Sequence, residues 1–220
     1  MQTVDRVVEH IKAKETDRPL VVFVCGFGGA GKTTFCHKLA GLLSRPCVVF
    51  ETDWYAKYAT TERKERIKSA LALQDHGLIE IEENPKNWYD WNALISGLQL
   101  LKTNGQLHIR HAWCQKTGEK QLSIELILPN VLNSVIICDG IYLLHDEIRK
   151  AADVCIRLDT TLDTCLERGR NRDAHRSTPE YLDYKAALTR RYDEPYFERF
   201  GMNADFVVSA AIPVESLSTT

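Results

Sequence analysis

One stretch near the amino terminus decides the fold: Val21-Val22-Phe23-Val24-Cys25-Gly26-Phe27-Gly28-Gly29-Ala30-Gly31-Lys32-Thr33-Thr34. An apolar run leads into Gly26, and Gly26-x4-Gly31-Lys32-Thr33 has the spacing of a phosphate-binding loop. Its glycines let several backbone N–H groups point into one concavity, which an anion can occupy. We expect Lys32 to reach the β- and γ-phosphates of a nucleotide and the Thr33 hydroxyl to bind Mg²⁺.

The residues around this loop distinguish a nucleotide site from a glycine-rich turn that binds nothing. A strand-like run precedes the loop and a helix-compatible segment, 34–43, follows it. A strand, a phosphate loop and a helix in this order favour nucleotide binding, and the helix dipole adds positive charge beside the phosphates. The predicted nucleotide contacts are Gly26, Phe27, Gly28, Gly29, Ala30, Gly31, Lys32, Thr33 and Thr34.

Length and composition suit one α/β domain over residues 1–220. The formal net charge of −2 gives no drive toward nucleic acid, and no apolar run approaches the length needed to cross a membrane. The seven cysteines form no Cys-x-x-Cys pair, and an odd number fits a reducing compartment. The sequence therefore predicts a cytoplasmic protein without nucleic-acid or membrane partners, and leaves open whether it is a homo-oligomer.

Strand-like and helix-like segments alternate along the chain. Short apolar runs rich in β-branched residues suit a parallel sheet that is covered on both faces. Such runs lie at 20–24, 47–50, 135–138, 154–158 and 205–208. We expect an α/β fold with helices on both faces of this sheet.

Three segments between these runs carry signals of their own. Asn87 can cap a helix that Asn104-Gly105 ends, and Thr178-Pro179 can begin another. Residues 106–128 hold two alternating runs around a Thr-Gly turn, which predicts a β-hairpin inserted beside the sheet.

An aspartate follows the second apolar run. Asp53 would lie at the carboxyl edge of the sheet, where α/β proteins bind ligands. There it could accept the proton of a substrate hydroxyl that attacks the γ-phosphate. Capping of the following segment explains an aspartate here equally well. The residue types alone leave the two roles open.

The run Val135-Ile136-Ile137-Cys138-Asp139-Gly140 has the form of a Walker B strand. Asp139 would hold Mg²⁺ directly or through water, although Asp-Gly is also a common turn. Gly140 stands where motor ATPases usually place a second acid that activates water. An enzyme that phosphorylates an alcohol must avoid hydrolysis, so Gly140 favours a kinase.

Arginines recur at helical spacing in the segment 166–177. Arg168, Arg172 and Arg176 would lie along one side of a helix. Such charge runs are most often solvated helix faces. The phosphate loop favours a mobile helical lid instead, because guanidinium groups suit the oxygens of a transferring phosphoryl group. Whether Arg176 joins Arg168 and Arg172 there stays open.

Together these motifs resemble the uridine kinase–phosphoribulokinase family of small-molecule kinases, over most of the chain. The segment 26–34 matches the family's phosphate loop, and Asp53-Trp54-Tyr55 is similar to its Asp-x-Phe-Tyr stretch. Asp139 replaces the usual glutamate of a strand that ends in Glu-Gly, and Arg168-x3-Arg172-Asp173 resembles the lid. The resemblance implies a P-loop NTPase-type parallel sheet with helices on both faces, an inserted β-hairpin and a helical lid.

The resemblance also implies a reaction and roles for residues. It implies a kinase that uses ATP and Mg²⁺ to phosphorylate a hydroxyl of a small metabolite. Asp53 would be the base; Lys32, Arg168 and Arg172 would assist phosphate transfer. Thr33 and Asp139 would hold the metal, and the stretch that contains Tyr55 would contact the acceptor.

The hairpin departs from the family. Uridine kinases carry Tyr-Asp-x-x-x-His-x-Arg, which recognises the pyrimidine, and this chain lacks the tyrosine, aspartate and histidine in register. Arg110 and His111 could meet an anionic or sugar-like acceptor, and Trp113 could stack on a ring or only pack the hairpin onto the sheet. A nucleoside, a pantothenate- or glycerate-like acid and a sugar phosphate all remain open.

Other P-loop classes fit less well. A regulatory GTP-binding switch normally carries Asn-Lys-x-Asp, and a transporter-type ATPase carries a Ser-Gly-Gly-like signature; the sequence has neither. A non-catalytic binding protein would not need Lys32, Thr33, Asp53 and Asp139 together.

Overall fold

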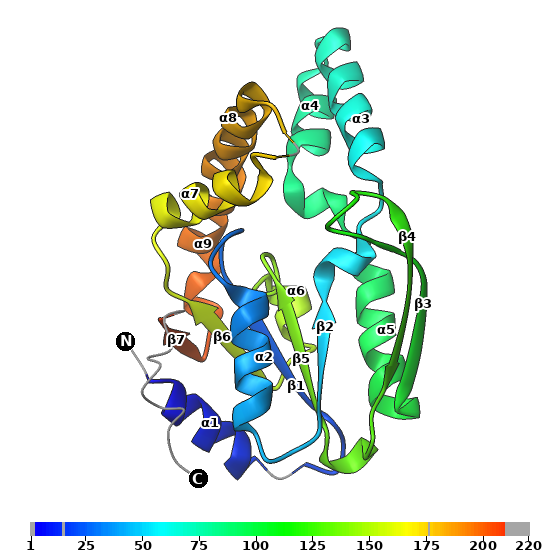
Figure 1. The fold of residues 1–220 in the computed structure, drawn as a ribbon, viewed down its shortest axis with the longest axis vertical. Helices are drawn as coiled ribbons and strands as arrows, with labels where there is room; N and C mark the ends of the chain where they lie inside the picture. The colour runs from blue at the N-terminus through cyan, green and yellow to red at the C-terminus, as the bar shows by residue number, and fades with distance from the viewer. Residues whose placement is uncertain (1–2, 15, 176, 210–220) are drawn as a thin grey trace.

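A parallel five-stranded sheet forms the centre of the computed structural model, which describes residues 3–14, 16–175 and 177–209 (Figure 1). The strands lie in the order β2-β5-β1-β6-β7. Their bounds are Leu20–Cys25 (β1), Cys47–Glu51 (β2), Val135–Gly140 (β5), Val154–Leu158 (β6) and Phe206–Val208 (β7). All five expected runs are strands of this sheet. Because β1 and β5 are parallel neighbours, with Cys25 opposite Gly140, the phosphate loop and Asp139 come to the same edge.

The side chains of β1 alternate between two apolar layers. Leu20, Val22 and Val24 pack with residues of α1 (Val4–Ala13) and α2 (Lys32–Leu42). Val21, Phe23 and Cys25 pack with residues of α5 (Trp91–Asn104), α6 (Asp146–Arg149) and α9 (Glu194–Phe200). Both faces are therefore covered, which explains the continuous apolar run and confirms the predicted architecture.

Two helix pairs extend beyond the carboxyl edge of the sheet (Figure 1). We call α3 (Thr60–Leu73) with α4 (His76–Glu83) the arm, and α7 (Leu162–Asp173) with α8 (Pro179–Leu188) the lid. Thr178 caps α8 as expected. No sequence pattern predicts the arm, because α3 buries only Ile67 and Ala70 and has weak helical periodicity.

The predicted hairpin is a separate two-stranded sheet. It consists of β3 (Gln106–Trp113) and β4 (Lys120–Ile127), and β3 packs beside α5 (Figure 1). The pairing register shifts between Ile109 and Ala112, and His111 has a φ of 57°. This irregularity is a bulge, which locally re-aims the side chains of β3.

The predicted cap of α5 is wrong. The helix begins at Trp91, and the Asp90 Oδ1 accepts a hydrogen bond from the Ala93 N–H at 2.9 Å. Asn87 instead lies in a short 3₁₀ turn, Pro85–Trp88, that Asn84 caps. Tyr89 then adopts extended backbone, which separates this turn from α5.

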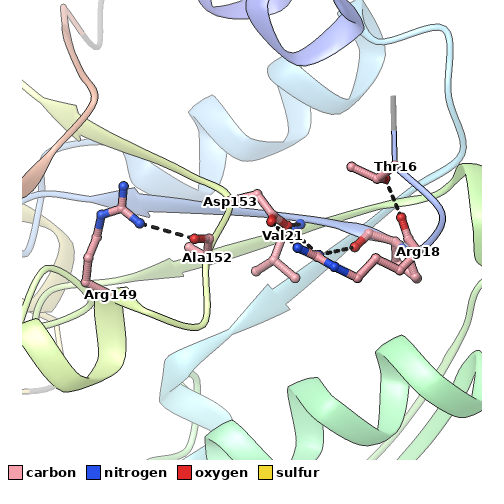
Figure 2. A network of polar contacts seen from close by, with 7 residues as sticks. Thr16, Arg18, Val21, Arg149, Ala152 and Asp153 are labelled. Atoms are coloured by element: carbon pink, nitrogen blue, oxygen red, sulfur yellow. Dashed lines mark hydrogen bonds and ion pairs between the residues drawn. The ribbon is translucent and has the colours of Figure 1, made fainter. Parts of the chain in front are cut away.

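Arg18 and Asp153 form an ion pair at the amino-terminal ends of β1 and β6 (Figure 2). The Arg18 guanidinium donates to both oxygens of Asp153, at 2.9 and 2.5 Å, and the Val21 N–H donates to Oδ2 at 2.8 Å. Burial opposes ionisation of Asp153, but Arg18 and the Val21 amide outweigh it and hold the carboxyl pKa below its ordinary value.

We expect Asp153→Asn to lower the free energy of unfolding by about 1–2 kcal/mol at pH 7, because it weakens these charge-assisted hydrogen bonds. A depressed folded-state pKa stabilises the protein above the pKa of the unfolded aspartate. The difference between variant and wild type should therefore be complete above about pH 4 and shrink as the pH falls further, through the lowered folded-state pKa of Asp153. Urea unfolding at several pH values measures it.

The exposed pair Arg170–Asp183 provides a control, because Asp183 is 65% exposed. Asp183→Asn should hardly change stability at any pH. Equal effects of the two substitutions, or an Asp153→Asn effect that does not shrink as the pH falls below about 4, would contradict this account.

In the part of the chain that the structure describes, no helix has both the length and the apolar character to cross a membrane.

Candidate active site

A cavity of about 970 Å³ lies between the phosphate loop, the arm, the lid and the tip of the hairpin. Eleven predicted site residues line it, contributed by segments far apart in the sequence. They are Gly28, Gly29, Gly31, Lys32, Thr33, Thr34, Asp53, Trp113, Asp139, Arg168 and Arg172. We call this cavity the cleft.

Other predicted nucleotide contacts lie behind the loop. Gly26 and Ala30 are buried, and the Phe27 ring packs edge-on against Phe197 at 4.6 Å. The backbone of Phe27 nevertheless contacts a side chain of the cleft, because its carbonyl oxygen accepts a hydrogen bond from Lys32 Nζ at 3.0 Å.

Three predicted acceptor contacts do not line the cleft. Tyr55 stacks on Phe50, with ring centroids 5.6 Å apart, and its hydroxyl lies against Gly97 of α5. Arg110 and His111 are exposed on β3, outside the cleft lining, at the bulge that disturbs the hairpin register. Trp113 borders the cleft, and its indole N–H donates to the Gly118 carbonyl at 3.1 Å, within the turn of the hairpin itself. Arg176 lies outside the described residues.

Thr33 and Asp139 fit a magnesium site. The Thr33 hydroxyl donates to Asp139 Oδ2 at 2.6 Å, and Asp139 is buried at the end of β5. Burial raises the carboxyl pKa of Asp139, while Lys32 and the Thr33 hydrogen bond oppose the shift. Among the described residues no group of three or more His, Cys, Asp and Glu side chains could hold a metal. Two protein oxygens suit Mg²⁺, which keeps waters and takes phosphate oxygens as its other ligands.

Asp53 lies in a 3₁₀ turn, Thr52–Tyr55, directly after β2. The Tyr89 hydroxyl donates to Asp53 Oδ1 at 2.9 Å, and the Asp53 side chain caps no helix. The Thr52 hydroxyl donates to the Asp139 carbonyl at 2.6 Å, which fixes the turn against β5. This geometry favours a role in the cleft over the capping alternative.

Three further residues line the cleft that the sequence did not predict there: Glu51, Tyr89 and Asp193. Glu51 lines the cleft and lies opposite Asp139 in the β2–β5 register; burial, followed by Asp139 and Asp53, raises its pKa to about 7. The sequence pattern that could have identified Glu51 is an acidic residue at the end of an apolar run, which is the pattern that identified Asp139. Tyr89 lies in an extended link between a 3₁₀ turn and α5, and Asp193 ends a π-helix; neither position has a periodic signal.

Buried carboxylates connect the elements around the cleft. Asp173, at the end of α7, accepts from Arg172 at 3.0 Å and from Lys185 of α8 at 2.7 Å. Glu83, at the end of α4, accepts from the Tyr184 hydroxyl at 2.6 Å and from Arg191 at 2.8 Å. The second set joins the arm to the lid side of the cleft.

The loop also packs closely on the lid. Gly29 has a φ of 93°, and a Cβ there would stand 2.3 Å from the Cys165 carbonyl oxygen of α7. We expect Gly29→Ala to lower Tm by about 4 °C or more, because backbone strain and the displaced helix cost roughly 1–3 kcal/mol. ATP affinity should fall with it, since the loop is displaced.

Gly28→Ala is the matched control within the same loop. A Cβ on Gly28 meets nothing within 4 Å, so the Tm should stay close to that of wild type. Differential scanning fluorimetry compares the two variants, and equal Tm values would show that the contact with Cys165 is unimportant.

The sheet order, the phosphate loop and the cleft that faces it define a P-loop fold of the nucleotide-binding type. The chain belongs to the phosphoribulokinase/uridine kinase family, whose model matches residues 21–209. The predicted family, fold class and enzyme class are confirmed. Membership in this family implies the use of ATP.

Relatives of known name support this placement. A uridine kinase from Ureaplasma parvum is 24% identical over 187 residues, which cover 81% of this chain and 83% of the relative. A structure titled a possible uridine kinase from Bacillus stearothermophilus has a TM-score of 0.61 at 20% identity, over 94% and 97% of the two chains. The D-glycerate 3-kinase of Cryptococcus neoformans has a TM-score of 0.57 at 16% identity, over 92% and 87%. Both structural likenesses concern the fold alone.

Proposed function

We propose that this protein is an ATP- and Mg²⁺-dependent kinase that transfers the γ-phosphate to a hydroxyl of a small metabolite, with a nucleoside as the first candidate. The observation that carries the proposal is the position of Asp53 in one cleft with Lys32 and Asp139. A carboxylate there can receive the proton of the attacking hydroxyl. The relatives named uridine kinase support the nucleoside.

The roles follow from the positions of the side chains. Thr33 and Asp139 would hold Mg²⁺, which neutralises phosphate charge. Lys32 would leave the Phe27 carbonyl to bind the transferring phosphate. Arg168 and Arg172 would close from the lid over its open side, excluding water.

A glycerate-type acid is the second candidate. Arg63 and Lys64 of the arm and Lys116 of the hairpin tip line the cleft and could meet a carboxylate. The absent pyrimidine pattern in the hairpin and the fold shared with a D-glycerate kinase also favour this candidate.

A phosphorylation screen tests the proposal. ATP consumption is measured with uridine, cytidine, pantothenate, D-glycerate and a pentose phosphate, each with and without Mg²⁺. We expect one acceptor to be phosphorylated at least about 100-fold faster than ATP is hydrolysed without acceptor. Rapid hydrolysis without any acceptor would contradict the kinase and leave an ATPase as the better account.

We also propose a cytoplasmic location. All seven cysteines are free thiols in the structure, as a reducing compartment requires.

A further inference from the structure

A second carboxylate in the cleft has the same local arrangement as Asp53. Asp193 lines the cleft although its residue is only 4% exposed. The Tyr142 hydroxyl donates to its Oδ1, as Tyr89 donates to Oδ1 of Asp53. The two carboxylates line one cleft, and their tyrosine donors contact the same ring: the centroids of Tyr89 and Tyr142 lie 5.4 and 6.5 Å from that of Trp91.

One oxygen of Asp193 remains available. Within the described part of the chain no hydrogen bond reaches its Oδ2, and that atom is not among the buried polar atoms that lack a partner. Oδ2 is therefore open to the cleft. A nearly buried carboxylate with a hydrogen bond to only one oxygen destabilises the folded protein, because burial disfavours its charged form.

The backbone around Asp193 is specialised. Asp193 ends a π-helix, Thr189–Asp193, between α8 and α9, and such turns occur frequently at functional sites. Its donor is fixed, since the Tyr142 ring is 1% exposed and packs edge-on against Tyr196 at 4.9 Å. Both partners of the hydrogen bond are thus held in place before any ligand arrives.

The charges around Asp193 restrict the group that it can bind. Lys32 lines the same cleft as Asp139 and Asp193, and its ammonium opposes a second cation there. Asp53 and Asp139, in the same cleft, oppose an anion. A neutral hydrogen-bond donor fits this position, and a hydroxyl is the simplest such group.

We propose that Asp193, oriented by Tyr142, binds a second hydroxyl of the acceptor, beside the attacking hydroxyl whose proton Asp53 accepts. Asp193 is then a specificity-determining residue that selects acceptors with two neighbouring hydroxyls. This inference rests on the proposed kinase function. An acid acceptor would place its carboxylate toward Arg63 and Lys116 instead.

The kinetic test compares acceptors that differ by one hydroxyl: uridine with 3′-deoxyuridine, and D-glycerate with 3-hydroxypropionate. For the pair of acceptors that it phosphorylates, the wild-type enzyme should have a kcat/KM at least about 10-fold higher with the acceptor that carries both hydroxyls. Asp193→Asn should raise the KM of that acceptor by about 10-fold or more, leave the KM of ATP within about twofold, and bring the preference close to 1. Tyr142→Phe should show the same pattern more weakly.

Two kinetic results would overturn the inference. A preserved preference in Asp193→Asn would show that Asp193 does not contact the second hydroxyl. A changed KM for ATP with an unchanged acceptor KM would make Asp193 a partner of Lys32. Asp183→Asn, on the exposed side of α8, is the matched substitution and should change neither value.

If no acceptor in the panel is phosphorylated, that result counts against the proposed function alone. A measurement of stability then tests the role of Asp193 separately. Asparagine can still accept from Tyr142 while removing a buried charge. Burial raises the pKa of Asp193 to about 6, against the opposing effects of Tyr142 and Lys32. The ionised form is therefore penalised above that pH, and Asp193→Asn should raise Tm at pH 8 and less so at pH 5. A lower Tm at pH 8 would make Asp193 a structural residue and overturn the inference.

Discussion

Asp53→Asn is expected to lower kcat by at least about 100-fold and to leave the affinity for an ATP analogue near that of wild type. Asparagine can keep the hydrogen bond from Tyr89 but cannot take a proton from the acceptor. Steady-state kinetics with the preferred acceptor and calorimetric titration with the analogue measure the two effects separately.

Asp75→Asn is the control for this substitution. Asp75 caps α4 at the outer end of the arm, and asparagine caps a helix as well as aspartate does. Its kinetics should match wild type. An Asp53→Asn enzyme that lost affinity for the analogue as strongly as it lost kcat would exclude Asp53 as the base.

Lys32→Ala is the second change with a large expected effect, a loss of about 10²–10³ in kcat. Lys32 lines the cleft with the buried carboxylate of Asp139, and no neutral side chain can stabilise the charge of the transferring phosphate in its place. Rapid-quench measurement of the phosphorylated product gives the rate of the chemical step.

Lys38→Ala provides the comparison on the same helix, because Lys38 is exposed on α2 and does not line the cleft. Both variants should retain the circular dichroism spectrum and Tm of wild type. Near-wild-type turnover of Lys32→Ala would remove the loop from the mechanism.

The sheet could be predicted because its signal is local. Each strand is a continuous apolar run, and Gly26-x4-Gly31-Lys32-Thr33 fixes where a phosphate can bind. Asp53 and Asp139 could be placed at one edge because parallel strands end together. These inferences need only the order of elements and the direction of the strands.

The rest of the cleft depends on packing that no local pattern encodes. Tyr89 reaches Asp53 from an isolated β-bridge with Ala56, and Tyr142 meets Asp193 across 51 positions of the chain. Arg110 and His111 lie at a bulge of the hairpin and outside the cleft lining. A one-residue irregularity in a strand changes which side chains face a ligand, and composition carries no trace of it.

The order of the strands has a consequence for biosynthesis. β1 lies between β5 and β6, so its two neighbours are the strands that begin at Val135 and Val154. A ribosome that has just completed the phosphate loop has made an apolar strand with both edges unpaired, and the arm and hairpin must emerge before either edge is covered. Pairings between such distant segments form slowly, and unpaired apolar strands aggregate. We expect the nascent chain to need protection by chaperones until β6 has left the ribosomal tunnel, well after its nucleotide loop has been synthesised.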